Sequence, residues 1–291
     1  MDKIVVIGGA GFVGSHTADV LSDKGFKVVI YDSKESPWIR KDQDMIIGDI
    51  LDTKQLSNAL SGSKYVYHFA GIADITESKE KPLETVKLNV LGTANVAQTC
   101  VDQRVDRLVF ASTMYVYSPY GSFYRATKQS SESIIQVFSE ELGLKYTFLR
   151  YGSLYGPRAQ DWNGLKGYVE QVINEGSLDY RGTGKEKREY IHVVDAAKLT
   201  SQILEDKYIN KAIIISGHQV LYSEEMIDLI FEIAGKEKKV SYKEQNINPD
   251  HYVNTPYRFT PKTAVKLVPE EFHDIGEGIL EVIEGISNSK G

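Results

Sequence analysis

The chain has 291 residues, of which 42% are apolar and 25% are charged, and its formal net charge is −6. These values are typical of a globular protein with one large domain or two interleaved ones, and the scattered basic residues give no footprint for a nucleic acid or a membrane surface. The single cysteine, Cys100, excludes an intramolecular disulfide. No apolar stretch approaches the roughly 20 residues of a membrane span. Since the first strand follows Met1 almost directly, we expect a cytoplasmic protein without a signal peptide, with neither nucleic acid nor membrane as a partner.

A glycine turn follows the first predicted strand, whose apolar run covers residues 4–7. Gly8 and Gly11 lack a Cβ atom, so the backbone can turn sharply and approach a pyrophosphate, and Gly14 allows the next helix to pack on the strand. The second strand, residues 27–31, ends at Asp32, whose carboxylate can accept hydrogen bonds from an adenosine ribose. This order of strand, glycine turn, helix and acid predicts a dinucleotide site, with the pyrophosphate at the helix N-terminus.

Strands and helices alternate through the first half of the chain, which is typical of a doubly wound parallel sheet. The predicted strands are residues 3–7, 27–31, 45–47, 65–69, 107–111, 146–150 and 212–216. The predicted helices are residues 55–60, 83–101, 130–142, 168–175, 194–204 and 224–234. We predict an α/β Rossmann-type fold with a smaller C-terminal substrate lobe. Residues 1–158 form the NAD-binding domain, to which 188–217 return, and residues 159–187 and 218–291 form the lobe.

A tyrosine and a lysine four residues apart, Tyr124 and Lys128, follow the fifth strand. At this spacing they share one helix face, so the ammonium can lie beneath the phenol. A phenol is a poor base at neutral pH, but a nearby ammonium and an oxidised nicotinamide both favour the phenolate. Thr113, at the end of the strand, can hydrogen-bond the same substrate oxygen. We predict that Thr113, Tyr124 and Lys128 are the catalytic residues. No His, Cys or carboxylate spacing resembles a metal site.

These pieces together resemble the extended short-chain dehydrogenase/reductases, specifically the nucleotide-sugar epimerase/dehydratase family with its UDP-glucose 4-epimerases. The resemblance covers almost the whole chain and rests on the stretches 68–72 (His-Phe-Ala-Gly-Ile), 89–93 (Asn-Val-Leu-Gly-Thr), 155–158 (Tyr-Gly-Pro-Arg) and 188–193 (Arg-Glu-Tyr-Ile-His-Val). It implies that Tyr124 is the base, that Lys128 is its partner and a ligand of the cofactor ribose, and that Thr113 assists.

The resemblance also implies the binding residues. The cofactor is NAD, and its predicted ligands are Gly8, Gly11, Phe12, Val13, Gly14, Asp32, Ser33, Asp49, Ile50, Phe69, Ala70, Gly71, Asn89, Tyr124, Lys128 and Tyr151. The predicted substrate is a nucleotide-diphosphate sugar, bound by Thr113, Ser153 and Arg188, the last at the diphosphate.

Particular residues narrow the reaction. Family 4,6-dehydratases carry Thr-Asp-Glu at the end of the catalytic strand, and decarboxylases of UDP-glucuronate have a glutamate at the position of Tyr115. This chain has Thr113-Met114-Tyr115 instead, without either carboxylate. The lack of these carboxylates disfavours dehydration and decarboxylation. It leaves reactions that transfer only a hydride and one proton.

Several positions depart from the family pattern. Residues 118–123 are much shorter than the corresponding stretch of relatives, Ser153 replaces an asparagine that often meets the diphosphate, and residues 252–262 lack the usual Arg-x-x-Asp pair. These departures leave the sugar and the nucleotide open.

We therefore predict an NAD-dependent nucleotide-sugar 4-epimerase that acts through a transient 4-keto intermediate. The alternatives are a nucleotide-sugar 4-reductase or dehydrogenase with exchangeable NAD(P)H, and a non-catalytic nucleotide-sensing protein on the same fold. A homodimer is expected, since relatives commonly pair through two helices. Val90, Ala94, Ala97 and Val101 lie at helical spacing for such a contact, but the same stripe could face the sheet.

Overall fold

The computed structural model describes residues 1–217 and 220–243. All of them belong to the first of two units, residues 1–259, and the second unit is residues 260–291. The part of the predicted lobe from residue 244 onward, including residues 252–262, lies outside the described residues. Within the described ranges, no helix is both long and apolar enough to cross a membrane.

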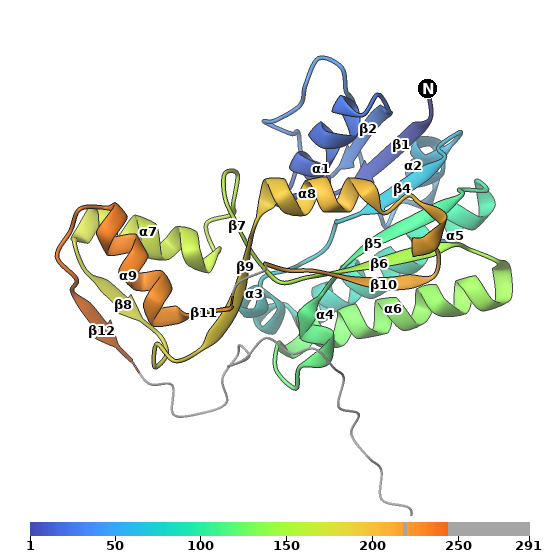
Figure 1. Ribbon diagram of the computed structural model, residues 1–291. Coiled ribbons are helices and arrows are strands. Elements are labelled where there is room, and N and C mark those ends of the chain that lie inside the picture. Colours follow the sequence, from blue (N-terminus) through green and yellow to red (C-terminus); the bar gives the residue numbers. More distant parts are fainter. Residues whose placement is uncertain (218–219, 244–291) are drawn as a thin grey trace, which may run out of the picture. The chain divides into compact units, whose positions relative to one another are not determined.

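A seven-stranded sheet forms the centre of the first unit (Figure 1). Its strands are β1 (Lys3–Ile7), β2 (Lys27–Asp32), β3 (Asp44–Ile47), β4 (Tyr65–His68), β5 (Arg107–Thr113), β6 (Tyr146–Tyr151) and β10 (Lys211–Ile215). Every neighbouring pair is parallel, and the order is β3-β2-β1-β4-β5-β6-β10. The order reverses between β1 and β4, so the crevice at their carboxyl ends is where such a sheet binds ligands. The predicted Rossmann-type sheet is confirmed.

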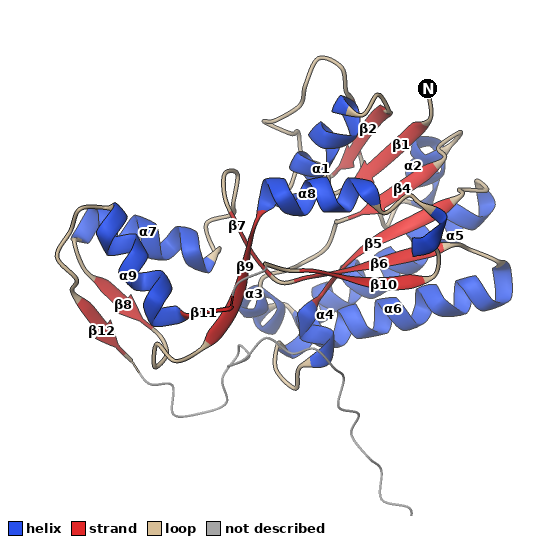
Figure 2. Ribbon diagram, in the orientation of Figure 1, coloured by secondary structure: helices blue, strands red, loops and turns tan. Residues whose placement is uncertain are grey.

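Helices cover both faces of this sheet (Figure 2). Ile4 and Val6 of β1 belong to the core formed with α1 (Phe12–Asp23) and α8 (Val193–Gln202). Val5 and Ile7 point to the other face and pack with α2 (Thr53–Leu60), α5 (Gly92–Asp102) and α6 (Ser122–Leu142). Both faces are therefore dry, which explains why the strands are continuous apolar runs rather than alternating ones.

The two helices nearest the predicted catalytic residues differ from their predicted bounds, and the helix predicted over 168–175 begins four residues earlier, as α7 (Gly164–Glu175). The helix predicted over 83–101 consists of α4 (Pro82–Val86), a π-helical segment η1 (Lys87–Leu91) and α5, joined through residues with helical dihedrals. The catalytic helix α6 begins at Ser122, well before residue 130, after Gly121 with φ of 99°. Its first two turns carry Tyr124 and Lys128 rather than an apolar stripe, so periodicity alone missed them.

Smaller elements complete the unit. A three-stranded sheet contains β7 (Ser153–Tyr155), β9 (Lys187–His192) and β11 (Val220–Tyr222). A separate apolar cluster joins α7 (Gly164–Glu175), β8 (Leu178–Tyr180), α9 (Ser223–Ile233) and β12 (Val240–Tyr242). Short helices are α3 (Ile75–Glu80), η2 (Met114–Tyr117) and η3 (Asp206–Tyr208). The domain boundaries given above remain a prediction.

Candidate functional site

The glycine turn connects β1 to α1 at the sheet reversal. Gly8 has φ of 79°, and a Cβ on it would lie 2.5 Å from the backbone nitrogen of Ala70. A Cβ on Gly14 would lie 2.2 Å from the carbonyl oxygen of Gly8. Only glycine fits at these two positions, so the turn keeps α1 close against the strand ends. No side chain caps the N-terminus of α1, which begins after Gly11 with Phe12 and Val13 in its first turn.

The open N-terminus of α1 fits a dinucleotide. The first backbone N–H groups of any helix have no partner within the helix, and the helix dipole is positive there. With glycines admitting close approach, these donors suit the pyrophosphate of NAD. Asp32 ends β2, where its Oδ2 accepts from the N–H of Ala10 at 3.0 Å and its Oδ1 from that of Lys34 at 3.2 Å; its contact with the adenosine ribose stays a prediction. The exposed Ser33 follows it.

The other predicted cofactor residues surround this crevice. Asp49 Oδ1 accepts from the N–H of Leu51 at 2.9 Å, and the buried Ile50 packs against Gly92. Phe69 lies between the rings of Tyr67 and Tyr151, with centroids at 6.3 and 6.5 Å. Ala70 and Gly71 follow Phe69 beside the glycine turn, and the hydroxyl of Tyr151 is hydrogen-bonded to Thr200 at 2.6 Å.

Asn89 is engaged by the protein itself. Its Oδ1 accepts from the N–H of Ile72 at 2.8 Å, and its Nδ2 donates to the carbonyl of Ile72 at 2.9 Å and to Thr127 Oγ1 at 3.0 Å. The side chain thus ties the loop after β4 to α6. These bonds favour a role in holding that loop, and direct binding of NAD by Asn89 stays a prediction.

Two of the predicted catalytic residues, Lys128 and Thr113, lie at the carboxyl end of β5. Lys128 Nζ donates to the carbonyl of Ala111 at 2.7 Å and lies 4.6 Å from the ring centroid of Phe110. Thr113, two residues further along the strand, caps η2 by accepting from the N–H of Tyr115 at 3.2 Å. Burial lowers the pKa of Lys128 to about 8, while Glu132 opposes the shift.

Tyr124 lies one turn before Lys128 on α6. Its ring meets that of Tyr115 edge-on, with centroids 6.1 Å apart. A Cβ on Gly121 would lie 2.6 Å from the Tyr115 ring, so the short 118–123 stretch brings the backbone against this aromatic pair. The result is a half-buried phenol on the helix that also carries the buried ammonium.

Sequence reasoning missed a buried ion pair next to these residues. Glu132 accepts from Arg150 Nε at 3.0 Å, from Arg150 Nη2 at 2.6 Å and from Ser112 Oγ at 2.5 Å. Arg150 also contacts the hydroxyl of Tyr117 and lies over its ring at 4.7 Å. One carboxylate thus joins α6, β5, β6 and η2. Glu132 stands four residues after Lys128, so the sequence places the two on one helix face but does not indicate the pairing with Arg150.

Two of the three predicted substrate residues, Ser153 and Arg188, belong to the three-stranded sheet, whereas Thr113 ends β5. Ser153 on β7 is opposite Tyr190 on β9, and Arg188 is two residues before Tyr190. Arg188 Nη1 donates to the carbonyl of Lys187 at 3.1 Å. The sheet brings both residues to neighbouring strands, and their contact with a substrate stays a prediction.

His68, at the end of β4, is fully buried, and its Nε2 is hydrogen-bonded to Thr93 Oγ1 at 3.1 Å. Burial lowers the pKa of His68 to about 3.

Known proteins share this arrangement. Residues 4–215 match the model of the NAD dependent epimerase/dehydratase family. The chain is 26% identical to the UDP-N-acetyl-alpha-D-glucosaminuronate decarboxylase of Bacillus cytotoxicus, over 97% of each chain. It is 30% identical to the UDP-glucose 4-epimerase of Mus musculus, over 68% of this chain and 72% of the relative. The crystal structure of Thermus thermophilus UDP-glucose 4-epimerase in complex with NAD superposes with a TM-score of 0.78 at 25% identity, over 89% of this chain and 90% of that one.

Proposed function

Because the chain belongs to the NAD dependent epimerase/dehydratase family, we propose that it is a nucleotide-sugar 4-epimerase. The observation that carries the proposal is the composition of the catalytic strand end. Lys128 is held against β5 beside Thr113, while residues 113–117 contain no carboxylate. A site with a tyrosine, a lysine and a hydroxyl, but no second acid or base there, suits a reaction that moves one hydride and one proton.

The proposed roles come from the family resemblance, and the position of Lys128 and Thr113 at the end of β5 supports them. The Tyr124 phenolate accepts the proton of the sugar 4-hydroxyl, and the Lys128 ammonium stabilises that phenolate and hydrogen-bonds the cofactor ribose. Thr113 donates to the same sugar oxygen. NAD, when bound, would supply the hydride acceptor and donor at the sugar carbon C4. Arg188 binds the diphosphate, and Ser153 lies near it.

The test is incubation of the protein with a panel of nucleotide sugars, read by NMR. We expect interconversion of a pair that differs only at C4, without added cofactor and without net formation of NADH. Tyr124→Phe serves as the inactive control. Turnover that consumes NAD(P)H in proportion to product would instead indicate the reductase or dehydrogenase.

Decarboxylation is the second candidate, because a decarboxylase matches almost the whole chain. Tyr115 argues against decarboxylation, because the family resemblance implies that decarboxylases have a glutamate at this position. The panel therefore includes a UDP-uronic acid. Loss of CO₂ from that substrate would contradict the epimerase proposal.

We also propose a homodimer. Part of the helical stripe predicted for the dimer contact is buried within the chain itself, since Ala97 is fully buried in the core and Val101 packs against the same cluster. Other apolar side chains remain outside: Leu83, Leu91 and Val137 are 84%, 51% and 54% exposed. They lie on α4, η1 and α6, which pack against one another.

A further inference from the structure

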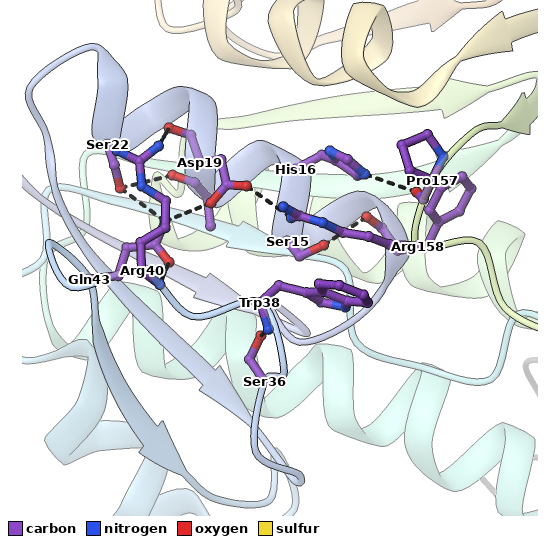
Figure 3. Close-up of polar contacts among 12 residues, drawn as sticks. Ser15, His16, Asp19, Ser22, Ser36, Trp38, Arg40, Gln43, Pro157 and Arg158 are labelled. Carbon is purple, nitrogen blue, oxygen red and sulfur yellow. Dashed lines mark hydrogen bonds and ion pairs between the residues drawn. The ribbon is translucent and has the colours of Figure 1, made fainter.

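A tryptophan, an arginine and an aspartate from three distant segments meet on the outer side of α1 (Figure 3). The guanidinium of Arg158 lies over the ring of Trp38, with its carbon 5.0 Å from a ring centroid. On its other side, Arg158 Nη1 is ion-paired with Asp19 Oδ2 at 2.9 Å. We call these three residues the Trp38–Arg158 clasp. A cation held between an aromatic face and a carboxylate is a favourable pairing of opposite charges and of a cation with a ring.

The clasp fastens two loops to the same helix. The loop between β2 and β3 is anchored at its far end, where Gln43 Nε2 donates to Asp19 Oδ1 at 3.1 Å. The segment after β7 is anchored through Pro157, whose carbonyl lies 3.0 Å from His16 Nε2. A carbonyl only accepts, so His16 donates from Nε2, and burial lowers the pKa of His16. Trp38 and Arg158 then join the two loops directly to each other.

The core does not require this arrangement. Trp38 is 41% exposed and lies at the tip of a surface loop. Arg158 has φ of 67°, the left-handed region that non-glycine residues rarely adopt. Strained backbone of this kind persists only where the surroundings hold it, and it gathers at ligand clamps and switch regions. Side-chain contacts on α1 and Trp38 are what hold Arg158.

The two loops leave the opposite ends of the dinucleotide crevice. The β2–β3 loop begins at Asp32 and Ser33, the adenosine end. The other segment follows Tyr151 and Ser153 of β6 and β7, on the side where β5 and β6 end together at the catalytic residues. Between them, α1 points its open N-terminus at the pyrophosphate position, with Phe12 one turn before His16.

We propose that the Trp38–Arg158 clasp retains NAD, because the loops flanking its two ends cannot separate while the clasp is closed. Release of the dinucleotide then requires the cation–π contact and the ion pair to break. The inference rests on the NAD dependence of the family and not on the proposed sugar reaction.

The test measures NADH release from the full chain with no sugar present. Protein loaded with NADH is mixed with excess NAD, and the loss of bound-NADH fluorescence gives the rate. We expect Trp38→Ala to release NADH about 10-fold faster or more, since it removes the cation–π contact that joins the two loops. Trp38→Phe keeps an aromatic ring, so its rate of NADH release should lie between those of wild type and Trp38→Ala. The double variant Trp38→Ala with Arg158→Ala should release no faster than the faster single variant, because both changes open the same clasp.

A matched control exists at the opposite edge of the sheet. Lys207 on η3 lies 4.9 Å from the ring centroid of Tyr208 and is ion-paired with Glu205 at 2.8 Å, a triad of the same chemistry before the amino end of β10. Lys207→Ala should leave the release rate unchanged. Melting temperatures without cofactor identify any variant that is merely less stable. Because Trp38 is partly exposed, Trp38→Ala tests the proposal even where Arg158→Ala does not fold. Release within twofold of wild type in folded Trp38→Ala would overturn it.

Discussion

Tyr124 carries the sharpest prediction at the scale of single residues. Tyr124→Phe removes one hydroxyl and keeps the ring against Tyr115, so the fold and NAD binding should persist. Proton transfer by a positioned side chain is worth about 10²–10⁴-fold, and turnover on the identified nucleotide sugar should fall by at least the lower factor. Thr113→Ala should lower turnover less than Tyr124→Phe does, provided that water replaces its hydroxyl. Lys128→Met should lower turnover and also weaken NAD binding. Near-normal turnover of Tyr124→Phe would move the role of base to Tyr115 or Tyr120.

Asp32 should set the choice between NAD and NADP. Its carboxylate would bind the ribose 2′-hydroxyl and repel a 2′-phosphate, so wild type should prefer NAD. Asp32→Ala should relax the preference on the order of 10-fold, the worth of a hydrogen bond to a charged group. It also removes the acceptor of the Ala10 N–H, so affinity for NAD itself should fall. Asp32→Asn, which retains an acceptor, separates the two effects in fluorescence titrations. Equal affinity of wild type for both cofactors would defeat the prediction.

At the scale of elements, Glu132 links the four segments around the catalytic residues. Burial lowers the pKa of Lys128 and Glu132 raises it, so removing the carboxylate should lower that pKa further. The ammonium is charged below its pKa and neutral above it, and the phenolate loses its partner as the pH rises. Wild-type turnover should therefore decline as the pH passes about 8, and Glu132→Gln should move this decline to lower pH. Glu140→Gln, exposed on the same helix, is the control.

The same ion pair makes a separate prediction for stability. Glu132→Gln leaves the guanidinium of Arg150 without its carboxylate, and breaking a buried pair costs about 3–5 kcal/mol. The double variant Glu132→Leu with Arg150→Met should recover much of the free energy of unfolding, since an apolar pair replaces the charges. Its turnover should still decline at the lower pH. Denaturant unfolding and a pH profile of kcat/KM measure the two effects; recovery of both together would show that Glu132 acts through stability alone.

At the scale of the whole molecule, the homodimer is a proposal that the exposed apolar side chains on α4, η1 and α6 support. Light scattering at micromolar protein should give twice the mass of the chain. Val137→Glu should yield the monomer, because it places a charge in the contact, whereas Ile173→Glu, at an equally exposed residue of α7, should not. A monomeric wild type under these conditions would remove the proposal.

The sequence by itself determined the features that depend on neighbours along the chain. The glycine turn, the acid at the end of β2 and the Tyr124–Lys128 spacing are local, and the rule that ligands bind at the carboxyl ends of parallel strands was enough to group them. The continuous apolar runs, alternating with helices, also predicted the parallel sheet, because strands buried on both faces must be apolar throughout.

Only the tertiary structure decided which distant side chains meet. Glu132 has many possible basic partners in the sequence, and it pairs with Arg150 because α6 packs on the sheet face formed by β5 and β6. Trp38 and Arg158 are far apart in the chain, and they meet because both loops pack on α1. The early start of α6 belongs here too, since its first turns serve the site rather than the core and so lack the apolar periodicity that marks a helix. Long-range pairing depends on how the elements pack, and no local pattern in the sequence records it.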